Sequence, residues 1–164
     1  MLKPVKNVFK MTYSFNKVTL PALRALARRA PSTAEGVEIV AITRSASVRL
    51  YQPEGPCPHG GALLWIHGGG YVLGTAAQDD TLCRRFVRRL GVPVASVDYR
   101  LAPKDPYPAA LEDCYSALAW LARQPGVVPG RVAIGGASAG GGLAAALALL
   151  ARDRRDLTPL FQLL

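Results

Sequence analysis

Residues 132–142 read Val-Ala-Ile-Gly-Gly-Ala-Ser-Ala-Gly-Gly-Gly, and this stretch decides the fold. Its apolar beginning predicts a short buried strand, and the alanine-rich sequence that follows predicts a helix. Between them lies the pattern Gly136-x-Ser138-x-Gly140, which is typical of a sharp strand-to-helix turn that exposes a serine. Side chains at Gly136 and Gly140 would collide with neighbouring backbone, which explains the glycines. We therefore interpret Ser138 as a candidate nucleophile, whose hydroxyl needs exposure and a base within reach.

A second glycine-rich motif supports this interpretation. His67-Gly68-Gly69-Gly70 directly follows the apolar run 62–66, where three glycines let backbone N–H groups approach a substrate closely. Ala139 would open the helix after the serine, so its N–H lacks a helical partner and can point at a developing oxyanion. Gly-x-Ser-x-Gly alone is weak evidence in a chain with 16 glycines, and the alternative is a structural or nucleotide-binding turn. The two motifs together favour the catalytic interpretation.

Apolar runs and helical patterns alternate along the chain. The expected strands are 37–43, 47–51, 62–66, 92–97, the run from residue 132, and 160–164. The expected helices are the segment 20–30, then 79–90, 110–123 and 139–152. Leu82, Phe86 and Leu90 form the predicted buried stripe of the second of these helices. This alternation predicts an α/β fold with a mostly parallel sheet and helices on both faces, with residues 1–35 as a separate helical segment before an α/β domain, 36–164.

Composition narrows the function classes. Twenty Lys and Arg against 11 Asp and Glu give a net charge of +9, which raises a nucleic-acid-binding alternative. The arginines recur in helical runs, such as 84, 85, 88 and 89, and we interpret these runs, including Arg24 and Arg28, as solvated helix faces. Since no nucleic-acid-binding motif accompanies them, we expect no nucleic-acid partner.

The cysteines and the apolar segments indicate the compartment. Three widely spaced cysteines, Cys57, Cys83 and Cys114, argue against a disulfide framework and fit a reducing compartment. With only two histidines and no close Cys/His pair, we expect neither a metal nor a cofactor. No signal-peptide pattern and no apolar run long enough to span a bilayer is visible, so we expect a cytoplasmic protein.

Four blocks of sequence resemble, in the same order, the hormone-sensitive-lipase-like family of α/β-hydrolases, which includes bacterial carboxylesterases and lipases. The blocks are Leu-Trp-Ile-His-Gly-Gly-Gly-Tyr at 64–71, Val-Asp-Tyr-Arg-Leu-Ala-Pro at 97–103, Tyr-Pro-Ala-Ala-Leu-Glu-Asp-Cys at 107–114, and Gly-x-Ser-Ala-Gly-Gly at 136–141. The resemblance covers most of the chain from about residue 37. It implies the α/β-hydrolase fold, a small-molecule carboxylic ester as the substrate, and hydrolysis through an acyl-enzyme.

The resemblance also implies a role for each matching residue. Ser138 would be the nucleophile, and the backbone N–H groups of Gly68, Gly69 and Ala139 would form the oxyanion hole. His67 would orient the glycine loop without acting as the base, and Asp98 and Arg100 would form a structural pair at a strand end. The helix at about 20–29 would belong to a cap that shapes the acyl pocket. The remaining motif positions, which support the site, are Gly70, Gly136 and Gly140.

The chain departs from the family pattern in two places. Ala137 stands where the family usually carries an acidic residue, and no histidine follows Ser138. The family's triad runs in the order Ser, Asp or Glu, His, whereas only Asp153 and Asp156 lie downstream here. We therefore expect an N-terminal portion of an esterase, truncated after the helix that follows Ser138 and with negligible activity alone. The alternative is a non-catalytic small-molecule binder or degenerate pseudo-enzyme on the same fold; the oligomeric state and the acyl specificity stay open.

Overall fold

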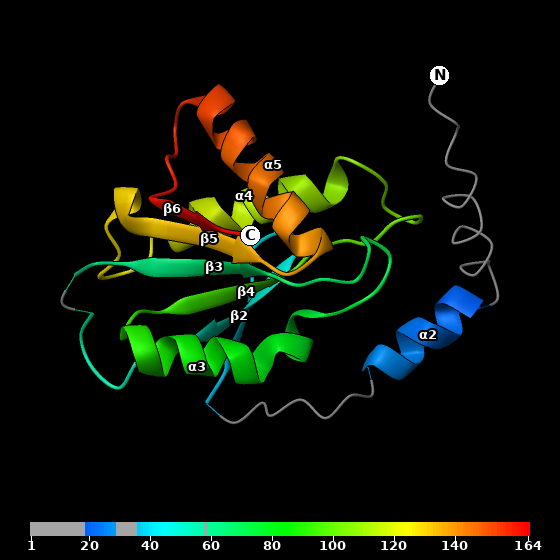
Figure 1. Ribbon diagram of the computed structural model, residues 1–164, viewed down its shortest axis with the longest axis horizontal. Coiled ribbons are helices and arrows are strands. Elements are labelled where there is room, and N and C mark those ends of the chain that lie inside the picture. The colour runs from blue at the N-terminus through cyan, green and yellow to red at the C-terminus, as the bar shows by residue number, and fades with distance from the viewer. Residues whose placement is uncertain (1–18, 29–35, 58) are drawn as a thin grey trace, which may run out of the picture.

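The computed structural model describes residues 19–28, 36–57 and 59–164, and within them the strands form one six-stranded sheet (Figure 1). The sheet order is β1-β2-β4-β3-β5-β6. The strands are β1 (Glu38–Ala41), β2 (Ser47–Tyr51), β3 (Ala62–Ile66), β4 (Val94–Asp98), β5 (Val132–Gly136) and β6 (Phe161–Leu163). The helices are α2 (Thr19–Arg28), α3 (Asp80–Leu90), α4 (Ala109–Leu121) and α5 (Ala139–Arg154), with short 3₁₀ helices η1 (Ala76–Asp79) and η2 (Pro129–Arg131).

The pairing of the strands confirms the predicted mostly parallel sheet. β1 and β2 form an antiparallel hairpin, and β2 pairs antiparallel with β4. From β4 onward the ladder is parallel: β3 lies between β4 and β5, and β6 follows β5. Every residue of β3 is buried, as a strand covered on both faces requires. The carboxyl ends of β3 and β5 are therefore neighbours at one edge of the sheet.

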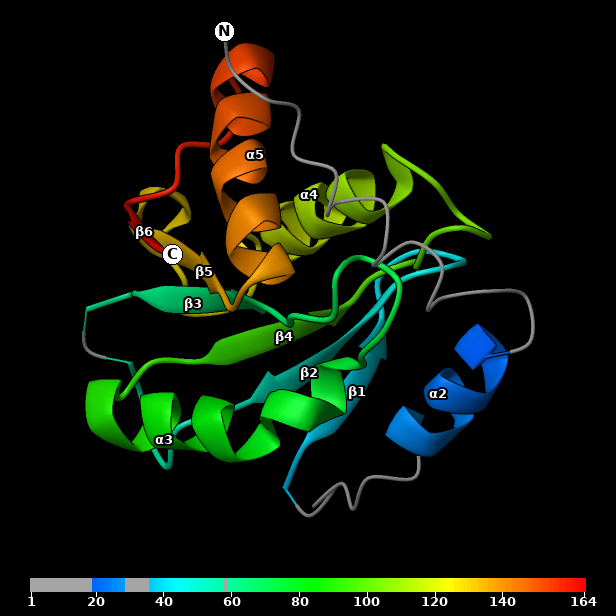
Figure 2. The ribbon, with the colours of Figure 1, turned by 45° about the vertical axis from the view of Figure 1, so that its right-hand side comes forward.

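Helices cover both faces of the sheet, as predicted. α3 packs on one face, and α4 and α5 pack on the other (Figures 1 and 2). The larger apolar core lies under α4 and α5 and includes Leu64, Leu118 and Leu147, which are almost completely buried. A smaller core lies under α3, where Trp65 meets Phe86 with ring centroids 5.3 Å apart.

The predicted buried stripe of α3 is wrong at one end. Leu90 is 56% exposed, whereas Asp80, Cys83 and Val87 face the sheet. The reason is an ion pair that apolar periodicity does not reveal. Arg49 of β2 is buried, and its Nε and Nη2 each lie 2.8 Å from a different carboxylate oxygen of Asp80. A buried charge must be paired, so the pair turns the Asp80–Cys83–Val87 face of α3 inward.

The elements predicted at the two ends of the chain are present in part. The predicted last strand is present but short, and the residues of β6 are exposed. In α2, Leu20 is buried, whereas Leu23 is 39% exposed. The rest of the expected N-terminal segment, 1–18 and 29–35, lies outside the described residues, so the division of the chain at residue 35 stays a prediction.

We expect Asp80→Asn to lower the free energy of unfolding by about 3–5 kcal/mol, because it leaves the Arg49 charge buried without its partner. The matched control is Asp153→Asn, which breaks the exposed Arg152–Asp153 pair and should cost less than about 1 kcal/mol. Urea unfolding of the two variants and the parent measures both values. Equal losses in the two variants would contradict the assigned role of Asp80.

Candidate functional site

Ser138 lies at the sharp turn between β5 and α5. It is the N-cap residue of α5, with φ 54° and ψ −117°, a positive φ that is strained for any residue with a side chain. The turn is held by backbone bonds from Ala137 N to Ile66 O, 3.2 Å, and from Gly140 N to Ala137 O, 2.9 Å. Ser138 is exposed, and Ala139 begins the helix as expected.

The two glycines of the pattern are required by close backbone packing, as the sequence predicts. A Cβ on Gly136 would lie 2.4 Å from the carbonyl oxygen of Gly140. A Cβ on Gly140 would lie 2.0 Å from the carbonyl oxygen of Ile66 and 2.6 Å from that of His67. Because these neighbours are backbone atoms, no rotamer change can make room. The first turn of α5 therefore packs directly on the end of β3.

The same contact brings the second motif to the serine. A Cβ on Gly68 would lie 2.9 Å from Ala137 O and 3.5 Å from the Cβ of Ser138, so the glycine loop touches the turn. Gly69 has φ 131°, and its carbonyl accepts hydrogen bonds from the N–H groups of Val72 and Leu73. The structure thus brings together the four residues that the sequence predicts as nucleophile and oxyanion donors.

His67 is completely buried, and it contacts the glycine loop and the residues at the end of β4. Its Nδ1 lies 2.8 Å from Gly68 O, and since a carbonyl only accepts, Nδ1 carries the proton. The ring stacks on Tyr99 with centroids 4.2 Å apart. Burial lowers the pKa of His67, although Nε2 lies 3.9 Å from Asp98 Oδ1. A neutral ring bonded to the loop backbone supports the predicted orienting role.

The predicted Asp98–Arg100 pair is wrong. Arg100 pairs with Asp113 of α4, at 2.8 Å from Nη2 to Oδ1, and its backbone N–H also donates to Asp113. Asp98 instead accepts a hydrogen bond from the N–H of Ala76. β4 ends at Asp98, so Arg100 lies beyond the strand. The rule that every second residue of a strand shares a face therefore does not place the two side chains together. The sequence feature that could have indicated the actual pair is Asp113, an acidic residue on the buried face of the next helix, α4.

The prediction that Arg24 lies on a solvated helix face is also wrong. Its Nε donates to Val72 O at 2.9 Å, and its Nη2 donates to Ala102 O. The N–H of Ala102 donates to Tyr71 O at 3.0 Å, so the segment after the glycine loop is bound to α2 and to the loop after β4. Helical periodicity predicts which face is apolar, but it contains no information on carbonyls that a distant loop presents.

Among the described residues, no hydrogen bond or ion pair joins Ser138 to a histidine or carboxylate. Asp153 pairs with Arg152, and Asp156 accepts a hydrogen bond from Tyr115. His59 is exposed and 8 residues before His67 in sequence. The partner that a serine nucleophile needs is therefore not provided by this part of the chain.

The described residues also contain no group of three or more His, Cys, Asp or Glu that could hold a metal ion. All three cysteines are free; Cys83 and Cys114 are buried, whereas Cys57 is half-buried. Burial raises the pKa of Cys83 to about 12, so this thiol is protonated and unreactive at neutral pH. In the same part of the chain, no helix combines the length and the apolar character needed to cross a bilayer.

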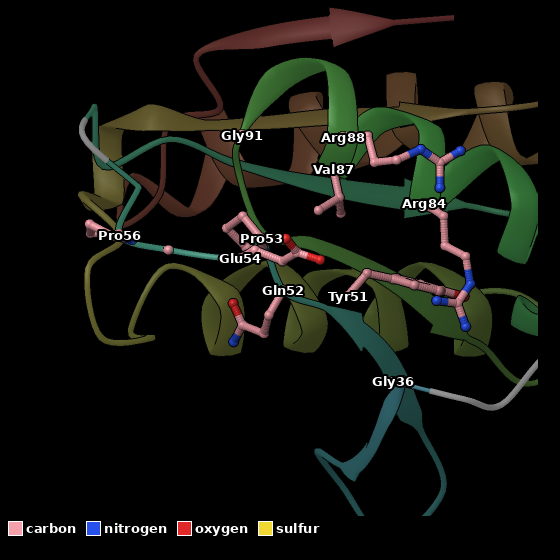
Figure 3. A pocket seen from close by; sticks show the side chains of 11 residues that line it. Gly36, Tyr51, Gln52, Pro53, Glu54, Pro56, Arg84, Val87, Arg88 and Gly91 are labelled. Atoms are coloured by element: carbon pink, nitrogen blue, oxygen red, sulfur yellow. The ribbon is translucent and has the colours of Figure 1, made fainter.

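Two of the cavities lie at opposite ends of the parallel strands. One, of about 340 Å³, lies beside the first turns of α5. The other, of about 570 Å³, lies between α3 and the segment after β2, with Tyr51, Glu54, Arg84 and Arg88 in its walls (Figure 3). Tyr51 pairs with Val94 at the beginning of β4, so this second cavity is at the amino ends of the parallel strands, away from Ser138.

The sequence of the chain is similar to the sequences of known hydrolases. A family described as "alpha/beta hydrolase fold" matches residues 63–164. The carboxylic ester hydrolase LipN of Mycobacterium tuberculosis is 48% identical over 113 residues, which are 65% of this chain and 29% of LipN. The ethyl acetate hydrolase of Pseudomonas putida is 44% identical over 115 residues, 67% of this chain and 36% of that protein. The chain thus spans about a third of the length of these relatives.

Solved structures agree with the sequence relatives. The esterase LipW from Mycobacterium marinum superposes with a TM-score of 0.78 at 36% identity, covering 91% of this chain and 52% of LipW. A bacterial heroin esterase superposes with a TM-score of 0.76 at 37% identity, covering 95% of this chain and 56% of that structure. The fold predicted from the sequence is therefore confirmed.

We expect Gly140→Ala to lower the free energy of unfolding by about 1–3 kcal/mol or more, because its Cβ must displace the backbone of Ile66. The control is Gly130→Ala, since Gly130 has no atom within 4 Å of an added Cβ. Thermal and urea unfolding measure both changes. If the two variants are equally stable, the close packing of α5 on β3 is not as described.

The lowered pKa of His67 predicts a pH-dependent stability. As the pH falls below about 6.5, the unfolded chain binds a proton that the folded ring does not, so the free energy of unfolding falls by up to ~1.4 kcal/mol per pH unit. Urea unfolding between about pH 5 and 7.5 measures this slope. His67→Gln should remove it, and the exposed His59→Gln should retain it. An unchanged slope in His67→Gln would contradict the assignment.

Proposed function

Since the chain belongs to the α/β-hydrolase family, which matches residues 63–164, we propose that Ser138 is the nucleophile of a carboxylic ester hydrolase. The observation that carries this proposal is the exposed serine at the strained turn, in contact with the glycine loop. Strain at a non-glycine residue is maintained where the surrounding packing fixes it, and such positions concentrate at functional sites. The names of the relatives, which include esterases and ester hydrolases, support the same chemistry.

In the reaction that we propose, backbone N–H groups stabilise the negative charge of the oxyanion, and Ser138 forms the covalent bond to the acyl group. The Oγ of Ser138 attacks the ester carbonyl carbon, and the N–H groups of Gly68, Gly69 and Ala139 donate to the oxyanion that forms. The tetrahedral intermediate releases the alcohol and leaves an acyl-serine, which water then hydrolyses. Each oxyanion donor contributes about 3–4 kcal/mol of transition-state stabilisation in well-studied hydrolases. These donors lie on a backbone that close packing holds rigid, so they need no reorganisation.

The proton of Ser138 has to pass to a base, and the family order puts that base after the serine in the chain. No histidine follows Ser138 here, and the chain spans about a third of its curated relatives. We therefore propose that residues 19–164 provide the nucleophile and the oxyanion hole, while the acid and the histidine are provided by other residues.

The free cysteines support a reducing, cytoplasmic compartment for the protein.

A second candidate function is a non-catalytic binder of small molecules on the same fold. The observation that favours it is the lack of a hydrogen bond between Ser138 and a base within the described residues. A fold alone does not determine whether a site catalyses or only binds.

If Ser138 is the nucleophile, ester hydrolysis should depend on it only in a protein that also contains the base. The 164-residue chain and its Ser138→Ala variant should hydrolyse p-nitrophenyl acetate at the same rate. Fused to the C-terminal segment of the Pseudomonas putida ethyl acetate hydrolase that follows the matched region, the chain should hydrolyse the ester. Ser138→Ala should then lower kcat of the fusion by about four orders of magnitude or more, whereas the exposed Ser45→Ala should not change it.

Each outcome distinguishes the alternatives. A folded fusion whose activity is unchanged by Ser138→Ala would show that Ser138 is not the nucleophile. A folded fusion that binds esters without hydrolysing them would support the binder. Rapid turnover by the isolated chain, lost in Ser138→Ala, would show that the chain already contains its base.

A further inference from the structure

Two carbonyls of the glycine loop are bound by side chains from other parts of the chain. The Tyr99 hydroxyl donates to His67 O at 2.9 Å, and Gln78 Nε2 donates to Gly68 O at 3.3 Å. His67 Nδ1 also donates to Gly68 O, at 2.8 Å. These carbonyls belong to the same peptide groups as the N–H groups of Gly68 and Gly69, which are two of the three proposed oxyanion donors.

The geometry of a peptide group connects each carbonyl to the donor behind it. A trans peptide group is planar, and its C=O and N–H point in opposite directions. The peptide bonds of the glycine loop are trans. A side chain that fixes His67 O therefore also fixes the direction of the Gly68 N–H. In the same way, the side chains that bind Gly68 O fix the direction of the Gly69 N–H.

The glycine loop needs such contacts from outside. The N–H groups of Gly68 and Gly69 have no acceptor among the residues that the structure describes, so the loop does not bind them itself. Glycine also has no side chain that would restrict its backbone. The side chains that bind the loop carbonyls are therefore what keeps the two N–H groups in one direction.

The sheet places Tyr99 at the beginning of this loop. β3 and β4 are parallel, with Ile66 opposite Val97, so the residue after β4 lies beside the residues after β3. Tyr99 is only 4% exposed, and its ring stacks on the His67 ring with an angle of 12° between the planes. Burial raises the pKa of Tyr99, so its hydroxyl keeps its proton and donates at neutral pH.

We propose that Tyr99 is a positioning residue for ester hydrolysis, which holds the Gly68 N–H toward the oxyanion through the carbonyl of His67. This inference rests on the proposed function, which assigns Gly68 as an oxyanion donor. Among the described residues, Tyr99 is the one side-chain donor to His67 O, whereas Gly68 O has two donors. Loss of the Tyr99 hydroxyl should therefore release the Gly68 N–H. Loss of the exposed Gln78 side chain should leave the Gly69 N–H held through His67.

The direction of the N–H groups can be measured by NMR in the 164-residue chain without turnover. Tyr99→Phe removes the hydroxyl and keeps the stacked ring. The residual dipolar coupling of the Gly68 N–H should then change, and its order parameter should fall from about 0.85 toward about 0.6. The matched control is Tyr115→Phe, which removes a hydroxyl bound to Asp156 and should change neither value. An unchanged Gly68 N–H in folded Tyr99→Phe would overturn the proposal.

If Tyr99→Phe does not fold, the exchange of hydroxyl protons with water in the parent chain decides the question. Slow exchange at Tyr99 supports the bond to the loop. Exchange as fast as at Tyr107, which is 85% exposed, overturns the proposal.

The fusion described above measures the effect on turnover. Tyr99→Phe should lower kcat per folded molecule about ten- to a hundredfold with KM nearly unchanged, because the misplaced donor serves a charge that forms only in the transition state. Complete removal of one donor costs about 10²–10³-fold in kcat, which sets the upper limit. Tyr115→Phe should retain kcat, and Gln78→Leu should lower kcat less than Tyr99→Phe does. An unchanged kcat in Tyr99→Phe would contradict the positioning role.

The failures of this inference and of the proposed function are separable. If Ser138→Ala leaves the activity of the fusion unchanged, the nucleophile assignment fails, and the dipolar coupling still decides whether Tyr99 directs the Gly68 N–H. If the activity depends on Ser138 but Tyr99→Phe changes neither the Gly68 N–H nor kcat, the inference fails alone.

Discussion

The close packing of the first turn of α5 on the end of β3 is the constraint on which the site depends. Gly140 lies so near the carbonyls of Ile66 and His67 that even a methyl group would overlap them. Because β3 and β5 are adjacent and parallel, Ile66 is in register with Gly136, and both strands end at the same height. The turn that follows β5 therefore has to bend away sharply, and the serine at its tip takes a conformation that is unfavourable by itself.

This packing also explains why two motifs far apart in sequence form one site. The glycine loop leaves β3 at the point where the serine leaves β5, and Gly68 touches the turn. His67 is buried beneath the loop, neutral, and bonded to its backbone, which favours one loop geometry. Backbone donors held in this way are effective for charge stabilisation, because they do not reorient during a reaction.

A second set of buried and half-buried polar contacts fixes the elements around the site. The bidentate Arg49–Asp80 pair orients α3, and the Arg100–Asp113 pair joins the end of β4 to α4. Arg24 bonds the segment after the glycine loop to α2. None of these three arginines lies on a solvated helix face, although positive charge is abundant in the chain. In each case the guanidinium is paired with carboxylates or carbonyls from another element, and for the buried Arg49 this pairing offsets the cost of burial.

The sequence by itself determined the order of strands and helices, the parallel core of the sheet, and the residues of the serine turn and the glycine loop. Those features follow from local rules: apolar runs, helical periodicity, and glycines where backbone approaches backbone. The tertiary structure decided which charges pair, which face of α3 is buried, and where the cavities lie. Asp98 and Arg100 are close in sequence but bond to different elements, because β4 ends between them. Pairing and cavities depend on distances between segments that share no local pattern, so only the folded chain determines them.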